Sequence, residues 1–291
     1  MIAGASLSLV LTSAFLHPLW NMLLKRSEDK VVFYLNIHLV FTLLFSFLLF
    51  LYPLGDITST GWMLVALSAG SHFFYQLFLC KTYEAGDMSL TYPIARSSPV
   101  FVMVLALIFL REIPSTAAVI GAVLVVAGAY LMNQKSLSPR SLLIPFDKRY
   151  LTAMIFAVLT AVWSAIYSII DKKGVLHMPP ILFFYLFFAF SGFMFLGYLL
   201  ILKERRKNYW RLLKQDKVKI TLASILEAAS YILILYAFRM SKVSYIVALR
   251  QISVVIGALY GVMFLKERYG AVRITASCII FAGAFCIVAF G

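Results

Sequence analysis

The stretch Ser89–Glu112 reads SLTYPIARSSPVFVMVLALIFLRE, and it holds an arginine and two prolines inside a segment otherwise apolar enough to cross a bilayer. A second stretch of this kind, Ser244–Glu267, reads SYIVALRQISVVIGALYGVMFLKE. An arginine at the centre of a membrane helix costs about 2.5–3.5 kcal/mol on insertion scales. Two of them at repeated positions, Arg96 and Arg250, therefore indicate a role inside the membrane that offsets this cost.

The composition predicts an integral membrane protein. Hydrophobic residues make up 63% of the 291 residues, charged residues make up 13%, and the mean hydropathy is +0.93. So little polar surface cannot coat a soluble globule of this length. The net charge of +14 would suggest nucleic acid in a soluble domain. In a membrane protein, basic residues gather in loops on one face, so no nucleic-acid partner is expected.

Apolar runs long enough to span a bilayer need about 20 residues each. Ten can be marked, at approximately 3–24, 31–52, 60–80, 89–110, 115–133, 151–171, 179–202, 218–238, 243–264 and 270–290. We therefore expect an all-α integral membrane protein with ten transmembrane helices. The first run has neither a basic start nor a small-residue cleavage site, so we expect a retained helix and not a signal peptide. The long connections are 134–150 and 203–217.

The loop charges predict the orientation. The odd-numbered loops and their flanks carry 19 Lys and Arg residues, and the even-numbered loops carry 5. Basic loops stay in the cytoplasm, so we expect odd-numbered loops inside and both termini outside, in the cytoplasmic (inner) membrane. The run 203–217, KERRKNYWRLLKQDK, is interpreted mainly as a topology anchor at the interface, with an anionic-lipid site as the alternative.

The two halves of the chain are related. A shift of 155 residues superposes Phe109–Glu112 on Phe264–Glu267, and Ala127–Ala129 on Ala282–Ala284. We therefore predict a first five-helix repeat at 1–133, a linker at 134–150 and a second five-helix repeat at 151–291. Because five is odd, the second repeat must be inverted in the membrane relative to the first, with the substrate site near the midplane. Gly128 and Gly283 are expected to permit close helix packing.

These features resemble the drug/metabolite transporter superfamily, ten-helix EamA type. The resemblance rests on Trp20 late in the first helix, on the helix-ending signatures Leu110–Glu112 and Leu265–Arg268, and on the Ala- and Gly-rich fifth and tenth helices. The stretch His17–Asn21, HPLWN, is also similar to a branch found near phosphonate-utilisation genes. The resemblance implies a secondary transporter that works by alternating access. Many members have the N-terminus inside, and the charge bias of this chain departs from that pattern.

Polar residues at helical spacing predict a cavity. The stripe on helix 60–80 contains His72, the stripe on helix 218–238 contains Glu227, and the stripe on helix 151–171 runs from Thr160 to Asp171. In lipid such stripes must face protein or water. We expect a midplane cavity lined by the first, third, fourth, sixth, eighth and ninth helices, with the fifth and tenth as scaffold. The candidate substrate-binding residues are Arg96, Arg250, Glu227, His72, Gln76, Tyr231, Trp20, Asn21, His17, Tyr92, Tyr167 and Gln251.

The charged residues leave two interpretations open. Glu227 and one arginine can form a buried ion pair that fixes helix packing, but the other arginine then stays unpaired, which is costly. We favour the second interpretation, in which a guanidinium binds an organophosphate, phosphonate or carboxylate group bidentately. Pro93 and Pro99 are predicted to loosen the helix near Arg96. Glu227 and His72 are the candidate proton sites, because substrate bound at Arg250 would release Glu227 to take up a coupling proton.

Other functions remain as alternatives. Within transport these are an amino-acid or zwitterion exporter and a flippase for a phosphorylated lipid. The sequence has no nucleophile–base pair and no paired catalytic carboxylates, so we expect no enzyme. The four histidines lack metal-binding spacing, and we expect no metal and no cofactor. The expected partners are a small-molecule substrate, the lipid bilayer and a coupling proton, with the protein a monomer or homodimer.

Overall fold

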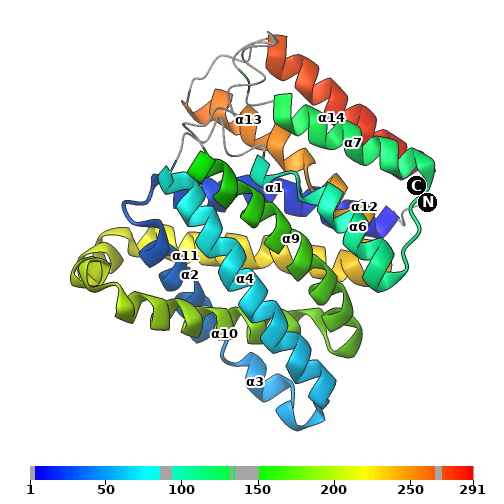
Figure 1. Ribbon diagram of the computed structural model, residues 1–291. Coiled ribbons are helices and arrows are strands. Elements are labelled where there is room, and N and C mark those ends of the chain that lie inside the picture. Colours follow the sequence, from blue (N-terminus) through cyan, green and yellow to red (C-terminus); the bar gives the residue numbers. More distant parts are fainter. Residues whose placement is uncertain (1–3, 86–93, 132–133, 135–150, 266–270, 291) are drawn as a thin grey trace.

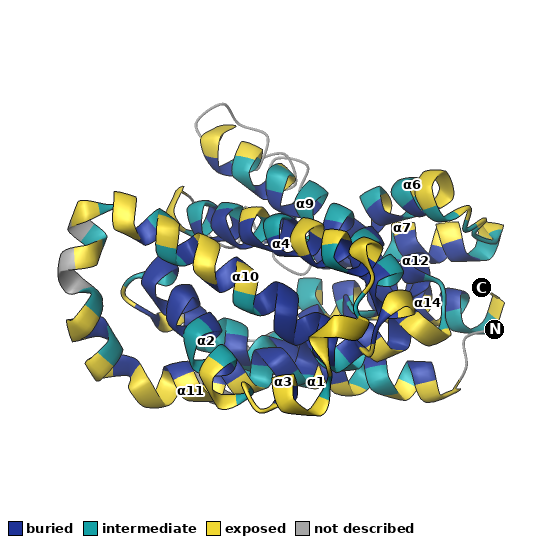
Figure 2. Cartoon of the chain, turned by 90° about the horizontal axis from the view of Figure 1, so that it is seen from below, coloured by how far each residue is buried: buried dark blue, intermediate teal, exposed yellow. Residues whose placement is uncertain are grey.

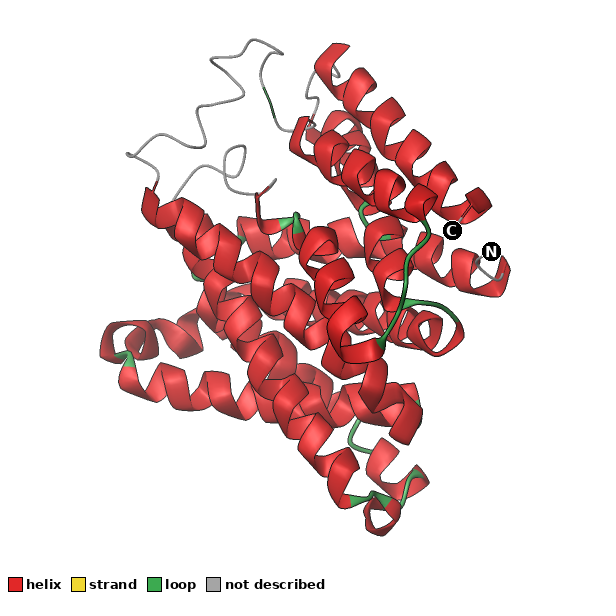
Figure 3. Cartoon of the chain, turned by 45° about the vertical axis from the view of Figure 1, so that its right-hand side comes forward, coloured by secondary structure: helices red, strands yellow, loops and turns green. Residues whose placement is uncertain are grey.

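The computed structural model describes residues 4–85, 94–131, 134, 151–265 and 271–290. Nearly all of these residues are helical, and no strand occurs among them (Figure 3). Six helices are long and apolar enough to cross a membrane, and four shorter apolar helices accompany them. The predicted all-α membrane fold is therefore confirmed.

The described residues of the first half form six α-helices and one short 3-10 turn. They are α1 (Gly4–Arg26), α2 (Lys30–Leu44), α3 (Leu48–Leu51), the turn Leu54–Asp56, α4 (Ser59–Ala85), α6 (Ser98–Leu110) and α7 (Thr116–Leu131). Asp29 precedes α2, and its Oδ1 accepts hydrogen bonds from the backbone N–H groups of Val31 and Val32 at 3.0 and 3.1 Å. This side-chain cap satisfies two donors that the first helical turn leaves without partners.

In the second half, residues 151–265 and 271–290 also form six α-helices. They are α9 (Leu151–His177), α10 (Pro180–Ile201), α11 (Lys203–Met240), α12 (Val243–Leu249), α13 (Ile252–Leu265) and α14 (Ala271–Phe290). Proline in the first turn of α10 suits a helix start, because that turn needs no N–H donor there.

The expectation that 203–217 is a connecting loop is wrong. These residues form the first part of α11, which runs without interruption for 38 residues. The segment has no glycine or proline to end a helix. Its basic side chains find acidic partners: Arg205 pairs with Asp29 at 3.1 Å and Glu84 at 2.9 Å, and Arg211 pairs with Glu28 at 2.5 Å. The hydrogen bonds from Arg211 lower the pKa of the exposed Glu28 carboxyl.

Helix pairs join the two halves in a regular pattern. The helix α1 packs on α11 and α4 packs on α9, while α2 packs on α10 and α7 on α14 (Figure 1). The first pair joins the first and eighth predicted helices, and the second pair joins the third and sixth. Exchanging the halves therefore converts one pair into the other and leaves the remaining pairs unchanged. This is the packing that an approximate two-fold relation between the halves produces.

Burial separates the inner faces from the outer faces of the helices (Figure 2). Large apolar side chains cover the outside, including Phe50 at 90% exposed, Leu43 at 74% and Phe285 at 64%. A soluble protein rarely exposes so many neighbouring apolar side chains, whereas lipid requires them. The outer surface therefore fits a bilayer.

The helices α7 and α14 approach closely at two glycines and lie side by side near both termini (Figure 1). A Cβ atom added at Gly121 would lie 2.6 Å from the carbonyl oxygen of Gly283. A Cβ atom at Gly283 would lie 2.5 Å from that of Gly121. Small residues permit such backbone contact between membrane helices. The expected packing role of Gly283 is thus confirmed, with Gly121 as its partner.

We expect Gly283→Ala to lower the thermal unfolding midpoint in detergent, because the new methyl group would push α14 away from the α7 backbone at a cost of about 1–3 kcal/mol. The matched control is Gly197→Ala on α10, where an added Cβ meets nothing within 4 Å. In a helix interior that exchange gains up to about 1 kcal/mol. Equal midpoints for the two variants would show that the glycine contact does not stabilise the fold.

Candidate functional site

Breaks in two helices position the two arginines. The helix α6 begins at Ser98, two residues after Arg96, and Pro99 lies in its first turn. This start agrees with the predicted loosening near Arg96, while Pro93 lies outside the described residues. Arg250 lies at the C-terminal end of α12, and α13 begins two residues later. The expectation of one continuous helix over 243–264 is therefore wrong.

The break at Arg250 forms without proline. The chain tightens there into shorter-range bonds, since Gln251 N donates to Ala248 O at 3.1 Å and Ser253 N donates to Arg250 O at 3.0 Å. Each bond spans three residues, as in a 3-10 helix and not an α-helix. Both arginines thus extend from short irregular segments inside apolar helices, which membrane proteins tolerate where protein or water surrounds the backbone.

Both arginines contact the same histidine. Arg96 Nη2 lies 2.7 Å from His17 Nε2, and Arg250 Nη2 lies 3.2 Å from His17 Nδ1. Asn21 Nδ2 is also 3.0 Å from His17 Nε2. A guanidinium is only a donor, and a neutral imidazole has only one acceptor nitrogen. A neutral His17 therefore cannot accept hydrogen bonds from all three of these side chains at once.

Arg250 has further contacts on its other side. Its guanidinium lies over the ring of Tyr231, 5.2 Å from the ring centroid, which favours a cation. Its Nε is buried and has no hydrogen-bond partner among the described residues. Glu227 is buried as well, and its Oε2 has no partner in the described part of the chain. Among the described residues no ion pair joins Glu227 to an arginine within 4.0 Å, although Glu227 and Arg250 line the same cavity.

The buried carboxylate that has partners is Asp171 on α9. It accepts hydrogen bonds from Ser68 Oγ at 2.6 Å and from Tyr231 OH at 2.5 Å, and His72 Nε2 lies 2.9 Å from its Oδ2. Asp171 is fully buried. The network therefore joins α4, α9 and α11 through one side chain, with both carboxylate oxygens satisfied.

His72 is held on its ring faces too. Its ring stacks on Tyr167 with centroids 4.1 Å apart and on Phe187 with centroids 4.4 Å apart. The ring of Tyr231 meets it edge-on at 5.2 Å. His72 is thus an interior histidine with an acidic partner, Asp171.

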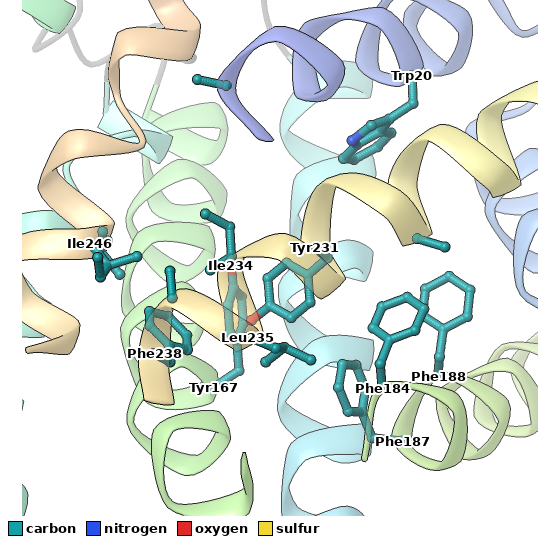
Figure 4. Packing of buried hydrophobic residues seen from close by; sticks show 14 of the residues in the cluster. Trp20, Tyr167, Phe184, Phe187, Phe188, Tyr231, Ile234, Leu235, Phe238 and Ile246 are labelled. Carbon is teal, nitrogen blue, oxygen red and sulfur yellow. The ribbon is translucent and has the colours of Figure 1, made fainter. Parts of the chain in front are cut away.

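A small cavity lies between these groups. The volume in which the centre of a water molecule fits is about 20 Å³, room for one or two waters. Aromatic residues of α10 form one wall, opposite Tyr231 of α11 and Tyr167 of α9 (Figure 4). Its lining consists of His17, Trp20, His72, Tyr75, Gln76, Tyr167, Phe184, Phe187, Phe188, Glu227, Tyr231 and Arg250. The site is thus nearly filled by side chains in this structure.

Most predicted site residues come together around this cavity. Those that line it are His17, Trp20, His72, Gln76, Tyr167, Glu227, Tyr231 and Arg250. Arg96 and Asn21 lie beside it and contact His17. Gln251 is buried but does not belong to the lining. Tyr92 lies outside the described residues.

The list of candidate binding residues omits Asp171, which the sequence placed only in a polar stripe, and the aromatic wall. Asp171 ends the polar stripe that begins at Thr160, and that stripe was the available signal. The wall residues Phe184, Phe187 and Phe188 occur in the run ILFFYLFFAF, where every position is apolar. Such a run has no polar face to indicate which side chains point inward.

The signature Leu110–Glu112, at the end of α6, contacts the start of α12. Arg111 ends the helix with a left-handed backbone, φ 54°. The next residue, Glu112, accepts hydrogen bonds from Val243 N at 3.0 Å and from the Ser244 hydroxyl at 3.1 Å. A carboxylate at a helix N-terminus satisfies free N–H groups and complements the helix dipole. The first half therefore caps α12, the segment that leads to Arg250.

Paired apolar helical halves around a closed polar centre define a multi-pass integral membrane protein. The model of the EamA-like transporter family matches residues 4–134 and again 151–289, and the chain belongs to this family. The resemblance to drug/metabolite transporters is thereby confirmed, and the protein is a transporter of that type.

Comparison with solved structures gives the same fold. A chain titled only "Crystal structure of protein" is similar over 99% of this chain and 97% of its own length, with a TM-score of 0.75. The two sequences are 12% identical, so the likeness concerns the fold alone. No curated protein matches the chain.

Proposed function

We propose that the protein is a secondary transporter for a small anionic metabolite that binds between Arg96 and Arg250. The observation that carries the proposal is the approach of both guanidinium groups to one imidazole ring, at 2.7 and 3.2 Å. An organophosphate, phosphonate or carboxylate supplies several acceptor lone pairs where His17 supplies one. It would therefore accept hydrogen bonds from both guanidinium groups at once, which one neutral imidazole cannot do.

Two further donors support an anion. Trp20 Nε1 and Arg250 Nε are buried, and neither has a hydrogen-bond partner among the described residues. Both residues line the cavity. A buried donor without an acceptor costs about 1–3 kcal/mol, which an oxyanion placed beside it would recover. Charge-assisted bonds from arginine are the stronger kind and favour bidentate geometry.

The two arginines come from different halves of the chain. Arg96 precedes α6 of the first half, and Arg250 precedes α13 of the second. An anion that contacts both would link the halves, and its release would allow them to separate. We propose alternating access on this basis, with the repeats 1–133 and 151–291 as the moving parts.

Glu227 is the proposed coupling site. Its carboxylate lines the cavity near Arg250, and its Oε2 has no partner among the described residues. His72 is already engaged by Asp171 at 2.9 Å, so we propose it as a positioning residue and not as the proton carrier. In this scheme Glu227 exchanges a proton as the anion binds or leaves Arg250.

A zwitterion is the second candidate, and Glu227 is the reason. The free carboxylate oxygen would accept an ammonium group while Arg250 binds the carboxylate of the same amino acid.

We retain the orientation indicated by the loop charges, with odd-numbered loops in the cytoplasm, both termini outside and the inner membrane as the location.

The test is thermal unfolding of the detergent-purified protein against matched small molecules. We expect organophosphates, phosphonates or carboxylates to raise the midpoint, since a ligand at about 100 times its Kd stabilises by about 2.7 kcal/mol. Size-matched amines and neutral polyols should leave it unchanged. A shift with amino acids alone would establish the second candidate in place of the first. No shift with any anion or zwitterion would refute both.

A further inference from the structure

A second cavity lies away from the central site, on the outer face of the bundle between α4, α6 and α9. The volume open to the centre of a water molecule is about 440 Å³, far larger than the central space. Its walls are mainly apolar and include Leu67, Leu105, Phe109 and Ile166. Leu67 and Phe109 are also exposed on the outer surface, at 49% and 58%. The groove therefore opens toward lipid.

The groove runs along one side of α9 for the depth of one membrane leaflet. It includes Ile166, Ile170, Lys173 and His177, which share a helix face because they follow one another at spacings of three and four. At 1.5 Å per residue, Ile166 and His177 lie roughly 16 Å apart along the axis. Half of a bilayer core is about 15 Å thick. An acyl chain of one leaflet matches this length.

The basic residues lie at the end of the groove that is formed by the C-terminus of α9. His177 is the last residue of α9, and Lys173 precedes it by one turn. The ammonium group of Lys173 has no hydrogen bond or ion pair with any described residue. Its neighbour Lys172 differs, because it donates to the carbonyl oxygens of Phe238 and Ser241. Lysine near a helix end extends its ammonium group to the headgroup level, where it attracts anionic lipid.

We propose that this groove is a binding site for an anionic phospholipid. One acyl chain lies between α4, α6 and α9, and the phosphate group lies at Lys173 and His177. The apolar walls select a chain, and the free ammonium group selects a negative headgroup. The basic run 203–217 is a weaker candidate for the same ligand, because Arg205 and Arg211 already pair with acidic side chains.

The site has a consequence for the centre of the protein. Tyr167 and Asp171 are each one residue from a groove residue, so they project about 100° away around α9. Tyr167 lines the central cavity, and Asp171 holds His72. A lipid in the groove would therefore pack against a different face of α9 from the one that carries Tyr167 and Asp171.

The experiment compares phosphatidylglycerol with phosphatidylcholine of the same acyl chains, added to delipidated protein and followed by native mass spectrometry. We expect wild type to bind phosphatidylglycerol at least about fivefold more tightly, as one basic residue near the surface contributes about that ratio. Lys173→Gln should reduce the preference toward one. The matched control Lys214→Gln removes the same charge from an exposed position on α11 and should retain the preference.

Two further measurements separate headgroup from chain. Leu105→Trp should fill the groove and weaken both lipids, and glycerol phosphate without chains should not compete with phosphatidylglycerol. Equal binding of both lipids by wild type, or an unchanged preference in a folded Lys173→Gln protein, would overturn the proposal. Full competition by glycerol phosphate would overturn it as well, because the groove would then have no part in binding.

Discussion

Arg250→Gln is expected to lower transport at least about 30-fold, because truncating one partner of a buried, hydrogen-bonded charge pair costs about 2–5 kcal/mol. The same variant should lose the thermal stabilisation by whichever anion stabilises wild type. Arg250 contributes a guanidinium 3.2 Å from His17 and a buried Nε without a partner among the described residues. Glutamine removes the charge and the guanidinium group but keeps the first part of the aliphatic stem and a polar amide. Uptake into proteoliposomes and the unfolding midpoint measure the two effects.

Three comparison variants make this result specific. Arg250→Lys retains the charge without the planar, bidentate geometry, so we expect weak binding and slow transport. Arg96→Gln should resemble Arg250→Gln, since Arg96 contacts the same imidazole at 2.7 Å. Arg239→Gln changes an exposed arginine at the end of α11 and should have no effect. Normal transport by a folded Arg250→Gln protein would exclude the anion site.

Asp171→Ala is expected to destabilise the protein by at least about 3 kcal/mol, because three buried groups would lose their hydrogen-bond acceptor at about 1–3 kcal/mol each. The substitution would leave Ser68, His72 and Tyr231 without the acceptor that they now share at 2.5–2.9 Å. Because these partners lie on α4 and α11, the loss would loosen both helices from α9. Thermal unfolding in detergent measures the effect, which should appear without any added ligand.

The pair itself can be tested with a double variant. Asp171→Leu combined with His72→Phe removes both partners and should be more stable than Asp171→Ala, since apolar replacements of a buried pair are often neutral. The control is Glu84→Gln, which removes a pair with Arg205 that is 38% exposed on the glutamate side. Exposed pairs contribute about 0–1 kcal/mol. A midpoint for Asp171→Ala equal to that of Glu84→Gln would contradict the role of the network.

The family and the number of apolar segments could be predicted because lipid restricts the choices. A spanning segment must be helical and about 20 residues long, so apolar length alone indicates a membrane helix. The polar stripes were equally informative, and eight of the predicted site residues line the cavity. A polar side chain inside a membrane almost always faces the interior of the helix bundle, because lipid offers it no hydrogen-bond partner.

Helix interruptions and helix ends were less predictable. Pro99 indicates the start of α6 in the sequence, but no proline or glycine beside Arg250 indicates the break between α12 and α13. That break depends on tertiary contacts, including the cap that Glu112 provides to α12 from 131 residues away in sequence. Likewise, the charged run 203–217 forms the first part of α11, where acidic side chains of α4 and of the α1–α2 connection pair with it.

By itself the amino-acid sequence determined a helical membrane protein of two related halves with arginines inside. Only the tertiary structure decided which groups meet: His72 with Asp171 across 99 residues, and Arg250 with His17 across 233. Hydrophobic length and helical period are local properties that a sequence displays directly. The partner of a buried charge is chosen by how distant helices pack, and several partners satisfy the same local pattern.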